Sequence, residues 1–245
     1  MSESHREIEC KEHGKREATF VCQHLPKGEG LGFHQGFTDD DPNALFPDAW
    51  CDCCEAVRES DGGWNARSES AAAISVLCSA CYLKRRLLNW PRASHAEEAE
   101  LVRRSVDYLR ERQALLAREY HINQHERYDW NQDSGLLVFS NQGVPAVVAD
   151  FQFVGSVSTR TSTWLWSWAN ESDLESVRSK MRQVRAYGEE RRLLKLACAY
   201  WSAEETDGWH MAAVAAYLLR AKGAYRSPDA HKFAFLLMTD VRWAQ

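Results

Sequence analysis

The clustering of cysteines near the N-terminus is the feature that most limits what this chain can fold into. Seven of the eight cysteines lie within the first 81 of 245 residues. The opening stretch MSESHREIEC lacks the apolar segment of a secretion signal, and no apolar run approaches the roughly 18 residues needed to cross a membrane. We therefore expect a cytoplasmic protein without a membrane partner. Disulfides are rare in that compartment, so the cysteines are expected to bind metal.

Four pairs of closely spaced potential ligands support this prediction. Two pairs are cysteine with histidine and two are cysteine with cysteine. In three of the four pairs, two residues separate the ligands, a spacing at which a tight turn can direct both side chains at one ion. In the fourth, VCQH, the ligands face the same side if the segment is extended. Eight ligands divide into two tetrahedral sites, so two structural zinc ions are expected. The predicted ligands are Cys10, His13, Cys22, His24, Cys51, Cys54, Cys78 and Cys81.

The spacing leaves the pairing of these ligands open. Sequential pairing joins the first pair to the second and the third to the fourth, and it is preferred because each site then closes on a local hairpin. Interleaved pairing, as in cross-braced zinc fingers, joins the first pair to the third. In WCDCCE, Cys53 is expected to be the surplus thiol. His34 is a substitute ligand if His24 faces away.

Both predicted sites have four ligands, which argues against catalysis by zinc. A catalytic zinc keeps an open position beside a general base, and the chain contains no H-E-x-x-H motif. It also lacks the nucleophile elbow, the P-loop and the dinucleotide-binding fingerprint. Cys198 lies in the apolar segment KLACAYW and is expected to be packed and inert. We therefore expect that the protein is not an enzyme.

A long helix is predicted from Ser94 to His121, because Ser94 and Glu97 form a capping box and one apolar stripe follows. The stripe is expected to pack against a core rather than a second helix, because Gln113 interrupts it. This helix separates the predicted domains. They are a zinc-binding domain at 1–90, the linking helix at 91–125 and an α+β domain at 126–245.

After residue 125 the apolar pattern changes to a period of two, which predicts strands. A hairpin is expected at 126–141, followed by two further strands. Trp164, Trp166 and Trp168 are expected on one face of the second of these, with Gly155 leaving room for an indole. The remaining predicted elements are helices near 172–188, 189–201 and 209–222, a loop at 223–230 and a closing strand. The predicted class is α+β, with a mostly antiparallel sheet packed by helices.

Several of these segments also resemble a known domain family. YDWNQDSGLLVF, FQFVGSVSTRTSTWLWSWAN, GAYRSP and FLLMTDVRW resemble a bacterial family of unknown function whose hallmark is the tryptophan-rich strand, over roughly residues 100–245. The resemblance implies a bacterial, cytoplasmic protein with the α+β layout, and no reaction. CKEHG followed by ATFVC resembles the B-box type of zinc domain over about 15 residues, which implies an interaction module.

The charge distribution favours a protein partner over nucleic acid. Residues 1–83 contain 7 Lys/Arg and 15 Asp/Glu, whereas a phosphate-binding finger needs a basic face. We expect a protein that acts by binding another protein, most concretely an immunity-type inhibitor that neutralises a toxin or nuclease. Its candidate surface includes Asp39, Asp40 and Asp41. The alternative is a small-molecule sensor or enzyme with a pocket at the face of Trp164, Trp166 and Trp168.

Overall fold

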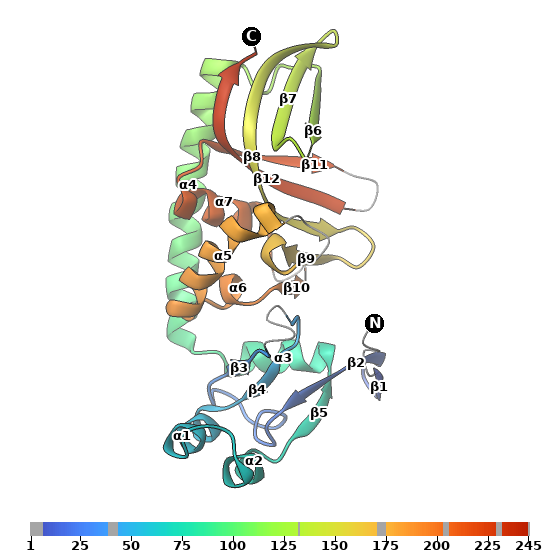
Figure 1. The fold of residues 1–245 in the computed structure, drawn as a ribbon, viewed down its shortest axis with the longest axis vertical. Coiled ribbons are helices and arrows are strands. Elements are labelled where there is room, and N and C mark those ends of the chain that lie inside the picture. The colour runs from blue at the N-terminus through green and yellow to red at the C-terminus, as the bar shows by residue number, and fades with distance from the viewer. Residues whose placement is uncertain are drawn as a thin grey trace. The chain divides into compact units, whose positions relative to one another are not determined.

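The computed structural model describes residues 7–38, 44–131, 133–170, 175–202, 206–228 and 232–244. The chain divides into two compact units, Met1–His95 and Ala96–Gln245. Each unit combines helices with a mostly antiparallel sheet (Figure 1). The predicted α+β class is therefore confirmed.

Within the described residues, unit 1 has a five-stranded sheet in the order β1-β2-β4-β3, with β5 also paired to β2. Strand β2 pairs antiparallel with β1 and β5, and parallel with β4 through Val21 and Ala49. The strands are β1 (Glu7–Cys10), β2 (Gly14–Val21), β3 (His34–Gly36), β4 (Asp48–Trp50) and β5 (Ser75–Cys78). The helices are α1 (Asp52–Ser60), α2 (Ala66–Ala72) and α3 (Ser79–Asn89).

The apolar core of unit 1 is small. Phe33 and Tyr82 pack edge to face with ring centroids 5.4 Å apart, and Trp90 lies beside Phe33. The buried Tyr82 hydroxyl donates a hydrogen bond to the Pro47 carbonyl at 2.6 Å. A domain with so few large apolar side chains needs another source of stability, such as bound metal.

Unit 2 contains a seven-stranded antiparallel sheet within the described residues. Its order is β10-β9-β8-β12-β11, with β7 also paired to β8 and β6 to β7. The longest strands, β8 and β12, lie side by side at its centre (Figure 1). The strands are β6 (Arg127–Asn131), β7 (Leu136–Asn141), β8 (Val144–Ser158), β9 (Thr163–Trp166), β10 (Tyr200–Ser202), β11 (Gly223–Pro228) and β12 (Lys232–Trp243).

Helix α4 (Arg92–Tyr120) begins two residues before the predicted start. Its apolar stripe packs within unit 2, as expected. Gln113 interrupts the stripe but donates a hydrogen bond to the Ala224 carbonyl at 2.6 Å, and Tyr108 donates to the Ala221 carbonyl at 2.9 Å. The other helices of this unit are α5 (Glu175–Glu190), the 3-10 helix η1 (Ser167–Ala169), α6 (Leu194–Ala197) and α7 (Gly208–Leu219).

Two segments differ from the prediction. The expected helix at 189–201 is the four-residue α6 followed by β10, and the expected loop at 223–230 contains β11. Both become strands because a partner strand is available: Trp201 pairs with Trp164 on β9, and β11 pairs with β12 along its length. Sheet pairing of this kind overrides local propensity.

Helix α5 also runs past its predicted end at Gly188 to Glu190. A Cβ at Gly188 would lie 2.5 Å from the Leu196 Cβ, so the glycine allows close packing of α6 instead of ending the helix. The start of the helix predicted near 172–188 lies outside the described residues.

The tryptophan-rich segment forms the core of unit 2. Trp164 and Trp166 are 0% exposed and Trp168 is 1% exposed. Strand β9 ends at Trp166, so Trp168 belongs to η1 rather than to the predicted strand face. The role predicted for Gly155 is confirmed, because a Cβ there would lie 2.7 Å from the Trp164 ring. The three indoles therefore present no exposed binding surface.

Candidate metal centres

Among the described residues, the eight predicted ligands form two groups in which one ligand atom from each member lies within 4.8 Å of the others. One group joins the first pair to the fourth and the other joins the second to the third. This nested arrangement differs from the preferred sequential pairing and also from the interleaved one. The groups are Cys10, His13, Cys78 and Cys81, which we call site A, and Cys22, His24, Cys51 and Cys54, which we call site B.

Site A forms because β5 lies antiparallel beside β2. Cys10 ends β1, and His13 occupies the turn before β2, where Gly14 has a φ of +65°. On the other side, Cys78 ends β5 and caps the N-terminus of α3, and its sulfur accepts a hydrogen bond from the Cys81 amide at 3.4 Å. The sheet thus brings together ligands about 65 residues apart along the chain.

Site B forms where β2 and β4 run parallel. Cys22 follows β2, and its amide donates to the Ala49 carbonyl at 2.8 Å, which places it beside the end of β4. Cys51 follows β4 as the N-cap of α1, and Cys54 lies in the first turn of that helix. The segment after Cys22 is a turn rather than an extended strand, and this turn brings His24 to the site.

The distances between the ligand atoms fit a tetrahedral zinc ion. With Zn–S near 2.3 Å and Zn–N near 2.0 Å, the edges of the tetrahedron are about 3.8 Å between two sulfurs and about 3.5 Å between sulfur and nitrogen. In site A, Cys10 and Cys81 are 3.9 Å apart, and three sulfurs lie 3.5 Å from the His13 Nδ1. In site B, the sulfur pair is 3.7 Å apart and two sulfurs lie 3.3 and 3.5 Å from the His24 Nδ1.

The thiols of each site lie close together, and this proximity contributes to the raised pKa of one thiol in each site. Burial and the neighbouring thiols Cys78 and Cys10 raise the pKa of Cys81 to about 12, and burial together with Cys22 and Cys51 raises that of Cys54. In contrast, backbone N–H groups at Glu12 and His13 lower the pKa of Cys10 to about 6. Three thiolates can share one site only beside a positive charge, which a divalent ion supplies.

Cys53, the predicted surplus thiol, and His34, the predicted substitute ligand, lie outside both groups. Cys53 is exposed, whereas Cys51 and Cys54 are buried. The His34 Nε2 lies 2.7 Å from an Asp52 carboxylate oxygen, so this histidine pairs with α1 rather than replacing His24. The proposed acidic surface at 39–41 falls outside the described residues.

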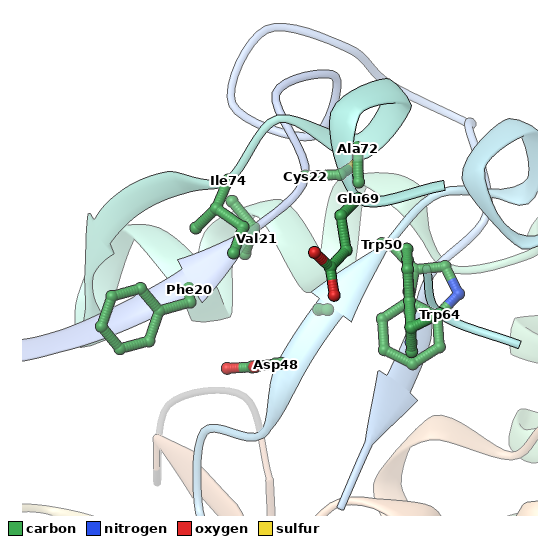
Figure 2. Close-up of a pocket in the computed structure, with 10 residues that line it drawn as sticks. Phe20, Val21, Cys22, Asp48, Trp50, Trp64, Glu69, Ala72 and Ile74 are labelled. Carbon is green, nitrogen blue, oxygen red and sulfur yellow. The ribbon is translucent and has the colours of Figure 1, made fainter. Parts of the chain in front are cut away.

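A pocket that the sequence reasoning missed lies next to site B. It has a volume of about 290 Å³, and its lining includes Cys22 and residues of β2, β4 and α2 (Figure 2). Trp50 and Trp64 form one wall, with their ring centroids 5.0 Å apart and their planes perpendicular. The lining residues are scattered between positions 20 and 74, so no contiguous motif could reveal the pocket.

In the part of the chain that the structure describes, no helix has the length and apolar character required to cross a bilayer.

Neither the curated proteins nor the solved structures contain a match to this chain. The model of a family of unknown function, DUF6882, matches residues 99–241, which is more than half of the chain and includes the tryptophan-rich core. The chain therefore belongs to the DUF6882 family.

Proposed function

We propose that sites A and B each hold a structural zinc ion through three cysteines and one histidine. The supporting observation is that each group supplies three thiolates and one imidazole at tetrahedral spacing, with one cysteine pair of each group at a helix N-terminus. Four protein ligands leave no position for a substrate, so the ions stabilise a fold rather than perform chemistry. The small core of unit 1 needs this contribution.

We further propose that the zinc-stabilised unit binds another protein, most concretely as an immunity-type inhibitor of a basic toxin or nuclease. Residues 1–95 contain 11 Lys/Arg and 15 Asp/Glu. Three thiolates around a divalent ion add a net negative charge at each site. An acidic surface of this kind favours and accelerates association with a basic cleft. A pocket at the tryptophan-rich strand, required by a small-molecule sensor or enzyme, gains no support from its buried indoles.

Affinity purification of the full chain from its own source, followed by reconstitution from the purified components, tests this function. The expected result is a stoichiometric complex whose association rate falls as salt is added. Reversing Asp39, Asp40 and Asp41 to lysine is expected to slow association, most strongly at low salt. Failure to reconstitute any complex, or an association rate that is independent of salt, would contradict the proposal.

A further inference from the structure

The pocket beside site B combines an apolar interior with acidic groups at its rim. Figure 2 shows Phe20 and Ile74 on one side and the two indoles of Trp50 and Trp64 on the other. Ile74 is 70% exposed and Trp64 is 41% exposed. Large apolar side chains grouped in this way around a hollow are typical of a binding site.

Two carboxylates belong to the same pocket. Asp48 lies on β4 and Glu69 on α2, and the Glu69 carboxylate points into the space between the strands and the indoles (Figure 2). Among the described residues, neither carboxylate has a cationic partner. Other acids of unit 1 do have one: Glu55 pairs with Arg58, and Asp61 with Arg67.

The surroundings of Asp48 favour neutralisation by a ligand. Nearby protein atoms partly desolvate its carboxylate and raise its pKa, although the residue as a whole is exposed. A cation that enters the pocket would pair with Asp48 and Glu69 and would also meet the exposed Trp64 ring, which attracts positive charge. Its stem must be apolar to contact Phe20 and Ile74. The Trp50 ring already has the Arg58 guanidinium over it, 5.9 Å from the ring centroid.

One edge of β2 next to the pocket is open. Val21 pairs with Ser75 of β5 and also with Ala49 of β4, so β5 and β4 flank opposite edges of β2. Strand β4 pairs with β2 only at Val21, and β1 pairs only with residues 14–17, which leaves residues 18–20 on that edge without a strand partner among the described residues. An open edge can accept an extended peptide through backbone hydrogen bonds, while an adjacent pocket takes one of its side chains.

We propose that this pocket binds an arginine side chain of an extended segment in a partner protein. Arginine fits better than lysine because its flat guanidinium can stack on an indole and donate to two carboxylates at once. The pocket volume suits a single side chain rather than a larger ligand. This inference rests on the proposed function in one respect, the choice of a protein as the ligand.

The test uses the full zinc-loaded chain and short capped peptides of identical sequence except for one central residue. That residue is arginine, lysine, norleucine or glutamate, and free agmatine serves as a small-molecule cation. Binding is followed by the indole NMR signals of Trp50 and Trp64. The variants Asp48→Asn and Glu69→Gln are compared with Glu111→Gln, an exposed carboxylate of unit 2. Zinc content confirms that each variant is folded.

The arginine peptide is expected to shift both indole signals in a saturable way, the lysine peptide more weakly, and the other two peptides not at all. Each pocket variant is expected to weaken binding by about threefold and the pair by about tenfold, because exposed ion pairs contribute modestly. Glu111→Gln should leave the affinity unchanged. Equal binding of norleucine and arginine peptides, or equal affinity in the pocket variants, would overturn the proposal.

Two further results separate this inference from the proposed function. Agmatine binding as tightly as the arginine peptide would show that the pocket recognises a small cation, and would overturn the choice of a protein segment. A purified partner that binds the wild type and the Asp48→Asn, Glu69→Gln double variant equally would overturn the pocket assignment, while the protein-binding function would stand.

Discussion

The cysteines at the N-terminus of α1 have very different environments. Cys51 is buried beside the His24 Nδ1 in site B, whereas Cys53 is exposed and belongs to neither group. The knuckle spacing alone selected Cys51 and Cys54 from the three thiols of CDCC, and these are the two that the structure places in site B. Spacing works here because a helix N-terminus places residues three apart on the same side.

Cys53→Ser and Cys51→Ser form a matched pair of substitutions on this helix. The Cys51 variant is expected to lose one zinc per chain, because site B is left with three protein ligands. The Cys53 variant should retain both ions and the wild-type thermal stability. Native mass spectrometry measures the zinc content of each, and loss of zinc from the Cys53 variant would contradict the assignment.

Glu55 gives unit 1 a pH-dependent contribution to stability. Hydrogen bonds from Arg58 and Trp50 lower its pKa from 4.5 to about 2. A lowered carboxyl pKa stabilises the fold above the unfolded value of 4.5, and this contribution disappears as the pH falls towards 2.

Glu55→Gln is therefore expected to reduce the free energy of unfolding by about 1 kcal/mol at pH 7. The difference from wild type should stay constant between pH 8 and 5 and shrink only below pH 4.5. Denaturant unfolding at several pH values measures it, with the exposed Glu59→Gln as the control. A difference that already shrinks between pH 8 and 6 would show that Glu55 does not carry the effect.

Among the elements, the pairing of β8 with β9 depends on one glycine. A Cβ at Gly155 would lie 2.5 Å from the Leu165 carbonyl oxygen and 2.7 Å from the Trp164 ring, and neither can move freely in a packed core. The sequence made this close approach predictable, because a glycine in a strand faced a run of tryptophans.

Gly155→Ala is expected to destabilise unit 2 by about 1–3 kcal/mol through overpacking. Ser156→Ala, on the next residue of the same strand, should change stability by much less because Ser156 is only partly buried. Thermal unfolding of the two variants measures the contrast. Equal stability of both would mean that the strands separate to accommodate the added methyl group.

Helices and strands whose apolar residues recur with a clear period were predictable from sequence. Strands that form only because a partner strand is available were not. The hairpin of β6 and β7 and the helix α4 carry their own signals in alternation and in a single apolar stripe. Strand β10 is three residues long and follows four residues of helix, so its apolar run matched a helix as well as a strand. Its state is decided by the partner strand β9.

The two units differ in what can stabilise them. Unit 2 buries a core rich in tryptophan, leucine and phenylalanine, whereas unit 1 has a small core and both candidate metal sites. Metal binding should therefore control the folding of unit 1 and not that of unit 2.

Removing metal with a strong chelator under reducing conditions is expected to unfold unit 1 and leave unit 2 folded. Amide hydrogen exchange measured by mass spectrometry reports on both units in one sample. Protection should be lost in β2 and α3 and retained in β8 and β12. Unchanged protection in unit 1 after complete removal of metal would contradict a structural role for zinc.

The members of the two candidate metal groups were predictable from sequence, but their grouping was not. Spacing identifies a pair because its ligands share one turn, but the joining of two pairs depends on which strands lie side by side. Here β5 pairs with β2, which places Cys78 in the same group as Cys10. In sequence, these two residues lie near opposite ends of unit 1. A preference for local hairpins therefore gave the wrong pairing.

The zinc content of the double variant Cys10→Ser, Cys81→Ser distinguishes the nested ligand groups from the sequential and interleaved pairings. Both residues belong to site A, so the nested arrangement predicts two zinc ions in the wild type and one in the double variant. Sequential or interleaved pairing would place these residues in different sites, and both ions would be lost. One zinc per chain in the double variant, measured by native mass spectrometry, supports two nested structural zinc sites. No zinc in the double variant, or none in the folded wild type, contradicts them.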